Sequence, residues 1–190
     1  MRKLSACLLL AYAIVFCGCG LKEKTSFKED RKVSVNNLQQ IGGAMMKYSF
    51  DYDDLLAHSF NQLDIYLEPG CFIAPYDKKS TPAETVKELT PDNTSYSCII
   101  PPNSSLPDGD GIFKIDYHLP IAFEKPWLLP EHAESIAVLF ADGSVKELRI
   151  KNVSKMSCEE LLEELLAPLD IDPLLKTAMI EEARTEDDRR

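Results

Sequence analysis

Several carboxylates lie close together in one glycine-rich part of the sequence and are the first candidates for chemistry. Asp108 and Asp110 alternate with glycines, and Asp116 follows shortly after them. Carboxylate oxygens on a flexible loop are the ligands that Ca²⁺ prefers. The complete spacing of an EF-hand is missing, because Leu119 stands at the twelfth position counted from Asp108, where that loop carries a glutamate. The pattern leaves two interpretations open, a calcium site and a polar turn without metal.

The cysteines and histidines form a second set of reactive groups. Cys71 and Cys98 flank a loop-rich region, and a disulfide between them would close a loop of about 28 residues, which stabilises a fold by about 3 kcal/mol in the chain-entropy model. We expect this disulfide in an oxidising compartment. A Cys–His protease that uses His58 or His118 has no supporting motif, and the sequence contains no nucleophile elbow, phosphate loop or zinc-binding spacing. We therefore expect no enzymatic activity.

The overall composition excludes some classes of protein. The 190 residues include 21 Lys and Arg against 31 Asp and Glu, a net charge of −10. A nucleic acid is not an expected partner, because phosphate binding needs a basic surface. No run of 18 apolar residues occurs, so the sequence predicts no ordinary transmembrane helix.

The N-terminus has the layout of an export signal. Arg2 and Lys3 precede an apolar stretch over residues 4–16, which at about 1.5 Å per residue is too short to cross a bilayer. The stretch ends in Phe16-Cys17-Gly18-Cys19, which resembles a bacterial lipoprotein processing box. The resemblance implies a signal peptide over residues 1–18 and lipid attachment to Cys19. The alternative is a secretory signal with incidental cysteines.

The segment behind Cys19 is rich in charged residues. Residues 19–34 are interpreted as a polar tether that reaches roughly 20 Å as a flexible chain and separates the anchor from a folded head. The expected location is the bacterial cell envelope, with the chain lipid-anchored to a membrane that faces away from the cytoplasm, the outer membrane in preference to the inner.

The pattern of apolar residues predicts an α+β head over residues 35–152. Residues 35–54 carry an apolar stripe at helical spacing, and Gly42 and Gly43 within it indicate close packing against a sheet. Residues 135–141 and 144–150 read as two strands joined by Asp142-Gly143 in a type I′ hairpin turn. Further strands are expected at residues 94–100, 112–115 and 121–123. The fold class is therefore α+β, an N-terminal helix packed on a small antiparallel sheet that ends in a β-hairpin, plus a C-terminal helical tail.

The C-terminal tail, residues 153–190, is acidic and helical. Ser157 and Glu160 form a capping box before a leucine-rich helix, and Asp172-Pro173 begins a second helix. Two interpretations stay open, a solvated appendage that docks through leucines and an amphipathic pair of helices that binds a partner. Because the helices carry their own caps, the head is expected to fold without them.

Three segments together resemble a known family. Residues 37–42 (NLQQIG), the proline-flanked residues 120–126 and the spacing of His132 from Asp142-Gly143, with nine residues between, are similar to the globular part of bacterial pseudopilin-like proteins of the type II secretion G kind. The resemblance covers about residues 36–150 and implies an α+β head with the His-x9-Asp-Gly motif. Those proteins begin with a prepilin peptidase site and a long hydrophobic helix, in whose place this chain has the lipoprotein box.

These observations predict a non-enzymatic, membrane-anchored envelope lipoprotein with a pseudopilin-like head. It would act through contacts with an envelope protein, and the resemblance relates it to secretion or pilus-like machinery. The alternative from another class is a calcium-stabilised extracytoplasmic binding module, for which Asp108, Asp110 and Asp116 would supply the ligands.

Overall fold

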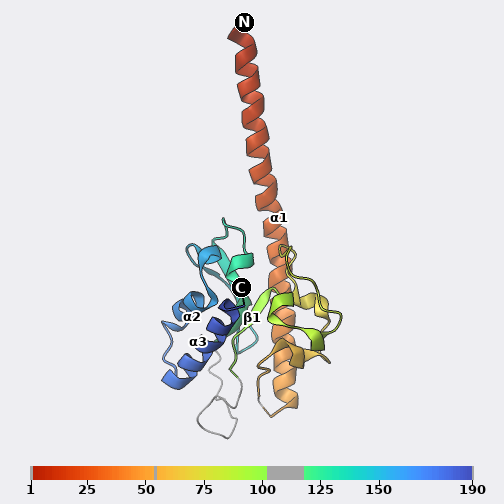
Figure 1. The fold of residues 1–190 in the computed structure, drawn as a ribbon, viewed down its shortest axis with the longest axis vertical. Helices are drawn as coiled ribbons and strands as arrows, with labels where there is room; N and C mark the ends of the chain where they lie inside the picture. Colours follow the sequence, from red (N-terminus) through yellow and green to blue (C-terminus); the bar gives the residue numbers. More distant parts are fainter. Residues whose placement is uncertain (1, 54, 102–117, 190) are drawn as a thin grey trace.

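A long helix, a four-stranded sheet and two C-terminal helices form three layers (Figure 1). The structure is a computed structural model that describes residues 2–53, 55–101 and 118–189, with side chains described from Phe27 onward. The elements are α1 (Arg2–Asp51), β1 (Tyr96–Cys98), β2 (Pro120–Glu124), β3 (Ser135–Phe140), β4 (Val145–Arg149), α2 (Cys158–Leu166) and α3 (Pro173–Asp187). The strands pair antiparallel in the order β1-β2-β3-β4. The predicted α+β class is confirmed.

Helix α1 packs on one face of the sheet through side chains three and four residues apart. Leu38, Ile41 and Met45 are fully buried there, as the apolar stripe predicts. Of the two glycines, only Gly42 lies against the sheet. A Cβ at this position would be 2.7 Å from Cδ1 of Leu139, whereas a Cβ at Gly43 would meet nothing within 4 Å.

The prediction of a flexible tether over residues 19–34 is wrong, because the structure shows these residues as helix. Helix α1 begins at Arg2 and continues without a break through residues 19–34. Arg31 and Ser34 are buried in the head, and the ring of Phe27 contacts that of Tyr76, with 5.6 Å between ring centroids. Arg31 and Ser34 have polar partners on the sheet, since Arg31 lies beside Ser135 and Glu124, and Ser34 donates to Glu124. Within the described residues, no helix is long and apolar enough to cross a membrane.

The β3–β4 hairpin forms where it was predicted, but its turn is of another kind. A type I′ turn needs positive φ at both central residues, and here only Gly143 has it, at 79°. The N–H of Gly143 donates to the carbonyl of Phe140, and the N–H of Phe140 donates to that of Ser144. Residues 141–143 therefore make a three-residue loop in which glycine takes the left-handed position.

Two of the three other predicted strands are confirmed, and the third cannot be checked on the described residues. The expected strands at residues 94–100 and 121–123 appear as β1 and β2. Residues 112–115 lie outside the described residues. Between α1 and β1 the described chain forms short 3₁₀ helices, at Phe60–Leu63, Pro69–Phe72, Val86–Glu88 and Pro91–Asn93.

The C-terminal helices belong to the same core as the sheet, which corrects the expectation of a separable tail. The predicted caps are confirmed, with Ser157 and Asp172 at the starts of α2 and α3. However, leucines of α2 and apolar residues of α3 are buried in one cluster with strand residues; they are Leu161, Leu162, Leu166, Met179 and Ala183. The carboxylate of Asp187 also accepts the N–H groups of Cys158 and Glu159 at the start of α2. The two helices therefore cover the face of the sheet opposite α1 (Figure 1).

Candidate functional site

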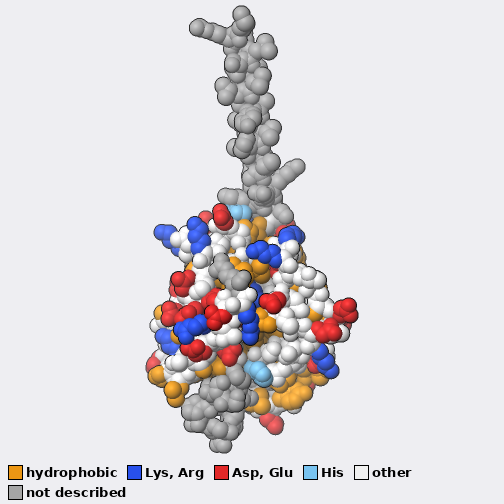
Figure 2. Space-filling view, in the orientation of Figure 1, with side chains coloured by type: hydrophobic (Ala, Val, Ile, Leu, Met, Phe, Trp, Pro, Cys, Tyr) orange, Lys and Arg blue, Asp and Glu red, His pale blue; other side chains and the backbone are white. Residues whose placement is uncertain are grey.

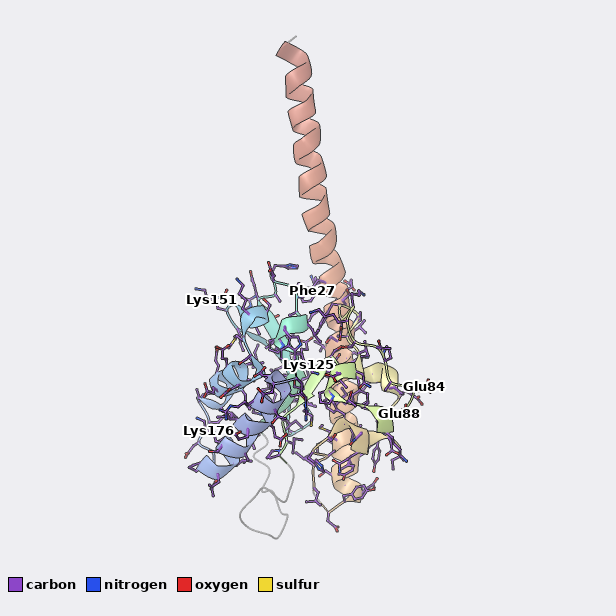
Figure 3. The ribbon with its side chains drawn as sticks, in the orientation of Figure 1. Phe27, Glu84, Glu88, Lys125, Lys151 and Lys176 are labelled. Carbon is purple, nitrogen blue, oxygen red and sulfur yellow. The ribbon has the colours of Figure 1, made fainter. Side chains whose placement is uncertain are left out.

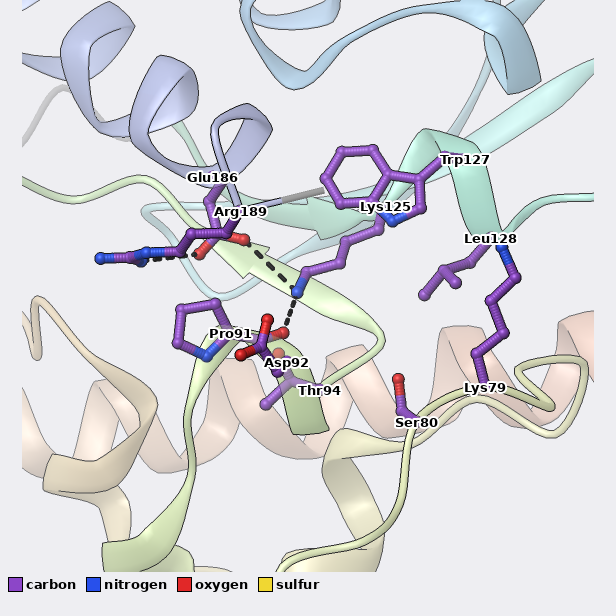
Figure 4. Close-up of a pocket in the computed structure, with 10 residues that line it drawn as sticks. All are labelled: Lys79, Ser80, Pro91, Asp92, Thr94, Lys125, Trp127, Leu128, Glu186 and Arg189. Atoms are coloured by element: carbon purple, nitrogen blue, oxygen red, sulfur yellow. Dashed lines mark hydrogen bonds and ion pairs between the residues drawn. The ribbon is translucent and has the colours of Figure 1, made fainter.

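A cleft of about 280 Å³ lies between the last turn of α3 and the segment that leads into β1 (Figure 4). It gathers charged side chains from segments that are far apart in the sequence. The described lining consists of Lys79, Ser80, Pro91, Asp92, Thr94, Lys125, Trp127, Leu128, Glu186 and Arg189.

Lys125 forms the floor of this cleft. It directly follows β2, and Pro126 behind it begins the 3₁₀ helix Pro126–Leu128, which prevents the strand from continuing. The side chain is only 4% exposed and lies in the middle of the head between α1 and α3, unlike Lys151 and Lys176 at the periphery (Figure 3). Its ammonium lies 5.9 Å from the centroid of the Trp127 ring, within range of a cation–π contact.

The ammonium of Lys125 is held by two acceptors. Its Nζ lies 3.3 Å from Oε2 of Glu186 and donates to the carbonyl of Pro91. Burial raises the pKa of the Glu186 carboxyl, and the nearby Lys125 ammonium opposes this shift. Because Lys125 already serves these two groups, it does not offer a free amine for nucleophilic chemistry. The pair instead ties α3 to the end of β2.

A second hollow of about 390 Å³ adjoins the cleft and shares Pro91, Thr94, Glu186 and Arg189 with it. It contains Cys98, whose thiol donates to the carbonyl oxygen of His58 over 3.5 Å. Burial raises the pKa of the Cys98 thiol to about 12, so the group stays protonated near neutral pH. A protonated thiol is a poor nucleophile, and this geometry gives no support to a Cys–His protease at this place.

A buried carboxylate connects α1 with the sheet on the opposite face. Glu124 at the end of β2 is fully buried. Its Oε1 accepts the hydroxyls of Ser34 and Tyr76, both over 2.6 Å. Its Oε2 accepts the N–H of Ala137 over 2.7 Å and lies 2.8 Å from Nη1 of Arg31. The carboxylate thus finds donors on both oxygens, which is what allows a charge to be buried.

The same cluster perturbs the tyrosine that it contains. Burial raises the pKa of Tyr76 well above its usual value, and the negative charge of Glu124 adds to the shift. Tyr76 therefore remains a hydroxyl donor to Glu124 at every ordinary pH. The arrangement is a structural clamp between α1 and the sheet.

The motif residues of the family resemblance lie at opposite ends of β3. Asp142 accepts the N–H of Ser144 over 2.8 Å in the hairpin turn. Hydrogen bonds from Ser144 lower the pKa of the Asp142 carboxyl. The bond from the Ser144 side chain has the larger effect, and the bond from its backbone N–H has the smaller one. His132 is exposed, and its ring contacts that of Phe27 on α1, with 5.7 Å between centroids. The motif therefore shapes a turn and a helix contact, and Gly143 supplies the left-handed turn residue.

The predicted disulfide is absent from the structure. Cys71 and Cys98 are both free thiols with different neighbours, because Cys71 donates to the side chain of Gln40 on α1, whereas Cys98 faces the His58 carbonyl. Cys158 is buried against the hydroxyl of Ser97, over 3.3 Å. The cysteines thus occupy three separate environments.

The calcium prediction cannot be placed on the described part of the chain. Asp108, Asp110 and Asp116 lie outside the described residues. The side chain of Cys19, the predicted site of lipid attachment, is also not described. Among the residues that the structure describes, no group of three or more His, Cys, Asp or Glu side chains could hold a metal ion.

Comparisons of the chain with protein-family models, with curated proteins and with solved structures find no match.

Both charged clusters escaped the sequence analysis. Arg31 lies three residues before Ser34, and Ser34 lies four residues before Leu38, so the two polar residues continue the buried stripe of α1. Glu124 and Lys125 stand together at the end of an apolar strand, directly before a proline. These two signals mark charges in buried positions, although neither identifies the partner.

Proposed function

We propose that the chain is a membrane-anchored envelope lipoprotein with a pseudopilin-like head that acts through protein–protein contacts and catalyses no reaction. Processing before Cys19 would leave α1 to begin at the lipid-modified residue. With a rise of about 1.5 Å per residue, the buried face of α1 would start about 12 Å from the anchor, at Phe27. The head would therefore stand close to the lipid on a helical stalk.

The observation that carries the proposal is an exposed apolar patch at the other end of α1. Phe50 is 87% exposed and Ile65 is 72% exposed, and Met46 and Tyr52 are also exposed. Figure 2 shows apolar side chains gathered at the lower right, over the C-terminal end of α1. Exposed apolar patches of this kind mark interaction surfaces.

The position of the patch favours a protein over lipid as its partner. Phe50 lies about 45 Å along α1 from Cys19, so an anchored chain would present it away from its own membrane. Asp51 and Asp53 accompany the patch, and carboxylates oppose binding to an anionic lipid surface. We therefore assign the patch to an envelope protein.

Mass spectrometry of the mature N-terminus tests the anchor. Acylated Cys19 as the first residue is the expected result, and a Cys19→Ser variant should lose the acyl chains. An unmodified amine at Cys19, or a different first residue, would contradict the lipoprotein assignment.

Cross-linking in intact membranes tests the contact surface. The Phe50→Asp variant should lose its cross-linked protein partner, since the charge replaces the apolar contact. Leu174→Asp is the matched control, because Leu174 is also exposed, at 58%, but lies on α3. Equal cross-linking of both variants and the wild type would exclude the patch as the contact surface.

A further inference from the structure

The cleft above Lys125 and the second hollow form one groove along the last turn of α3. They measure about 280 and 390 Å³, and Pro91, Thr94, Glu186 and Arg189 line both of them. Small-molecule sites in proteins have volumes of this order. The groove therefore has room for one small ligand unit in the cleft and a second unit in the adjoining hollow.

The rim that carries Lys79 is fixed by a buried carboxylate. Oδ1 of Asp77 accepts the backbone N–H groups of Lys79 and Ser80, over 2.9 and 3.0 Å. Oδ2 of the same residue accepts the hydroxyl of Ser95, which directly precedes β1, over 2.8 Å. Because Asp77 is buried, it ties this loop to the sheet, and Lys79 projects from a preorganised backbone.

The rim that carries Asp92 is fixed as well. The N–H of Thr90 donates to Oδ1 of Asn93 over 2.7 Å at the start of the short 3₁₀ helix Pro91–Asn93. The carbonyl of Pro91 accepts the Lys125 ammonium. In the view of Figure 4, Asp92 lies left of the centre of the cleft and Lys79 on the right, with Trp127 above them. A charge of each sign is thus held at a defined place in the cleft.

The charges along the groove balance. Its cations and carboxylates, with His58 counted as neutral, are Lys79, Lys125 and Arg189 against Asp92, Glu182 and Glu186. Lys125 and Arg189 both lie beside Glu186, at 3.3 and 3.9 Å. A small anion would meet the carboxylates of Asp92 and Glu186, and a small cation would meet Lys125 and Arg189. The groove therefore favours a ligand without net charge.

The cleft presents hydrogen-bonding groups that suit hydroxyls. The side chains of Lys79 and Asp92 make no ion pair or hydrogen bond with another described side chain. The ammonium donates and the carboxylate accepts, and charge-assisted bonds of this kind are about twice as strong as neutral ones. A hydroxyl can serve either group, because it both donates and accepts. The indole of Trp127 lines the same cleft and adds a flat apolar surface.

We propose that the groove binds a neutral sugar, with one ring in the cleft and a second ring of an oligosaccharide in the adjoining hollow. A sugar combines hydroxyls around its rim with an apolar C–H face. Its hydroxyls would donate to Asp92 and accept from Lys79, and the C–H face would lie against Trp127. A free amino acid fits less well, because its ammonium at Asp92 would approach the ammonium of Lys125.

The fluorescence of Trp127 tests the proposal directly, because it is the only tryptophan of the chain. The full chain is titrated with glucose, galactose, mannose and N-acetylglucosamine, and with maltose, lactose and diacetylchitobiose. At least one of these sugars should change the emission saturably, with a Kd of about 1 mM or tighter. Glycine and inorganic phosphate should give no saturable change over the same range of concentration.

Two substitutions test the residues that hold the sugar. Asp92→Ala and Lys79→Ala should each weaken binding by about tenfold or more, since each removes a charge-assisted hydrogen bond. Glu84→Ala and Lys151→Ala are the matched controls, because they remove the same charges at exposed positions outside the groove (Figure 3). The controls should leave the Kd unchanged, and all four variants should melt as the wild type does.

The outcomes separate this proposal from its alternatives. The absence of a saturable response to every sugar up to about 50 mM would overturn it, and so would binding that Asp92→Ala and Lys79→Ala leave intact. Saturable binding of glycine in place of a sugar would overturn it as well and assign the cleft to an amino acid. The proposal does not depend on the lipid anchor or on the patch at Phe50, so its failure is distinguishable from theirs.

Discussion

Adjacent glycines on α1 should respond in opposite directions to the same substitution. Gly42 and Gly43 are both helical, so alanine gains about 1 kcal/mol of helix propensity at either position. A Cβ at Gly42 would lie 2.7 Å from Cδ1 of Leu139 and 2.8 Å from the carbonyl oxygen of Gly143. A Cβ at Gly43 would point into open space.

The contacts set the size of the difference. The Gly143 carbonyl belongs to a turn that the Phe140 hydrogen bond holds in place, so the backbone cannot simply yield. Overpacking of this kind costs about 1–3 kcal/mol. Gly42→Ala should therefore lower the free energy of unfolding by about 1 kcal/mol after its propensity gain. Gly43→Ala should raise it by about 1 kcal/mol.

Urea denaturation of the full chain, followed by circular dichroism, measures both effects. The two variants should differ by about 2 kcal/mol in the free energy of unfolding, or by about 4–8 °C in melting temperature for a chain of this size. The denaturant slope should be unchanged, because the exposed surface is the same. If Gly42→Ala proved as stable as Gly43→Ala, the close approach of α1 to the hairpin turn would be refuted.

Four other outcomes follow from the packing and the charges. Glu124→Gln should lower the free energy of unfolding by about 3 kcal/mol, since it removes the buried carboxylate 2.8 Å from Arg31 and leaves this buried cation only Glu147, at 4.0 Å. The half-exposed Glu147→Gln should change it by less than about 1 kcal/mol in the same urea titration. Deletion of residues 153–190 should abolish cooperative thermal melting, because it strips leucines from the core; a cooperative transition would show that the tail is separable. Asp142 has a lowered pKa in the folded chain, so its contribution to stability is present above about pH 4 and is lost as the pH falls through the folded pKa. The advantage of wild type over Asp142→Asn in unfolding free energy should then vanish at low pH, and a difference that persists would refute this assignment. Burial raises the pKa of Cys158 to about 12, so alkylation at pH 8 should be slow until urea is added; rapid labelling of the native chain would contradict its burial.

Elements with a local chemical signal could be predicted well. The caps at Ser157 and Asp172 and the β3–β4 hairpin depend on residues within a few positions of one another, and each forms at its predicted place. The type of the hairpin turn was wrong, because the loop uses three residues and Asp142 does not take positive φ. The pattern Asp-Gly indicates a reversal of the chain, while the register of the strands selects its geometry.

The charged clusters could be predicted far less well. Glu124 is buried because Ser34 and Arg31 reach it from α1, about 90 positions away in the chain. Lys125 likewise meets Glu186 of the last helix. No local pattern states that these charges are partners, since a sequence position that indicates burial does not identify the distant residue that pairs with it.

The sequence by itself determined the helix after residue 35, the four described strands and the two C-terminal helices, since apolar periodicity and capping act over one or two turns. It also shows the lipoprotein-like box that ends in Cys19. Only the tertiary structure decided that residues 27–34 belong to the head, that the acidic tail completes the core, and that Cys71 and Cys98 have separate partners. The physical reason is that burial and pairing depend on contacts between distant segments, which form only when the sheet brings its two helical layers together.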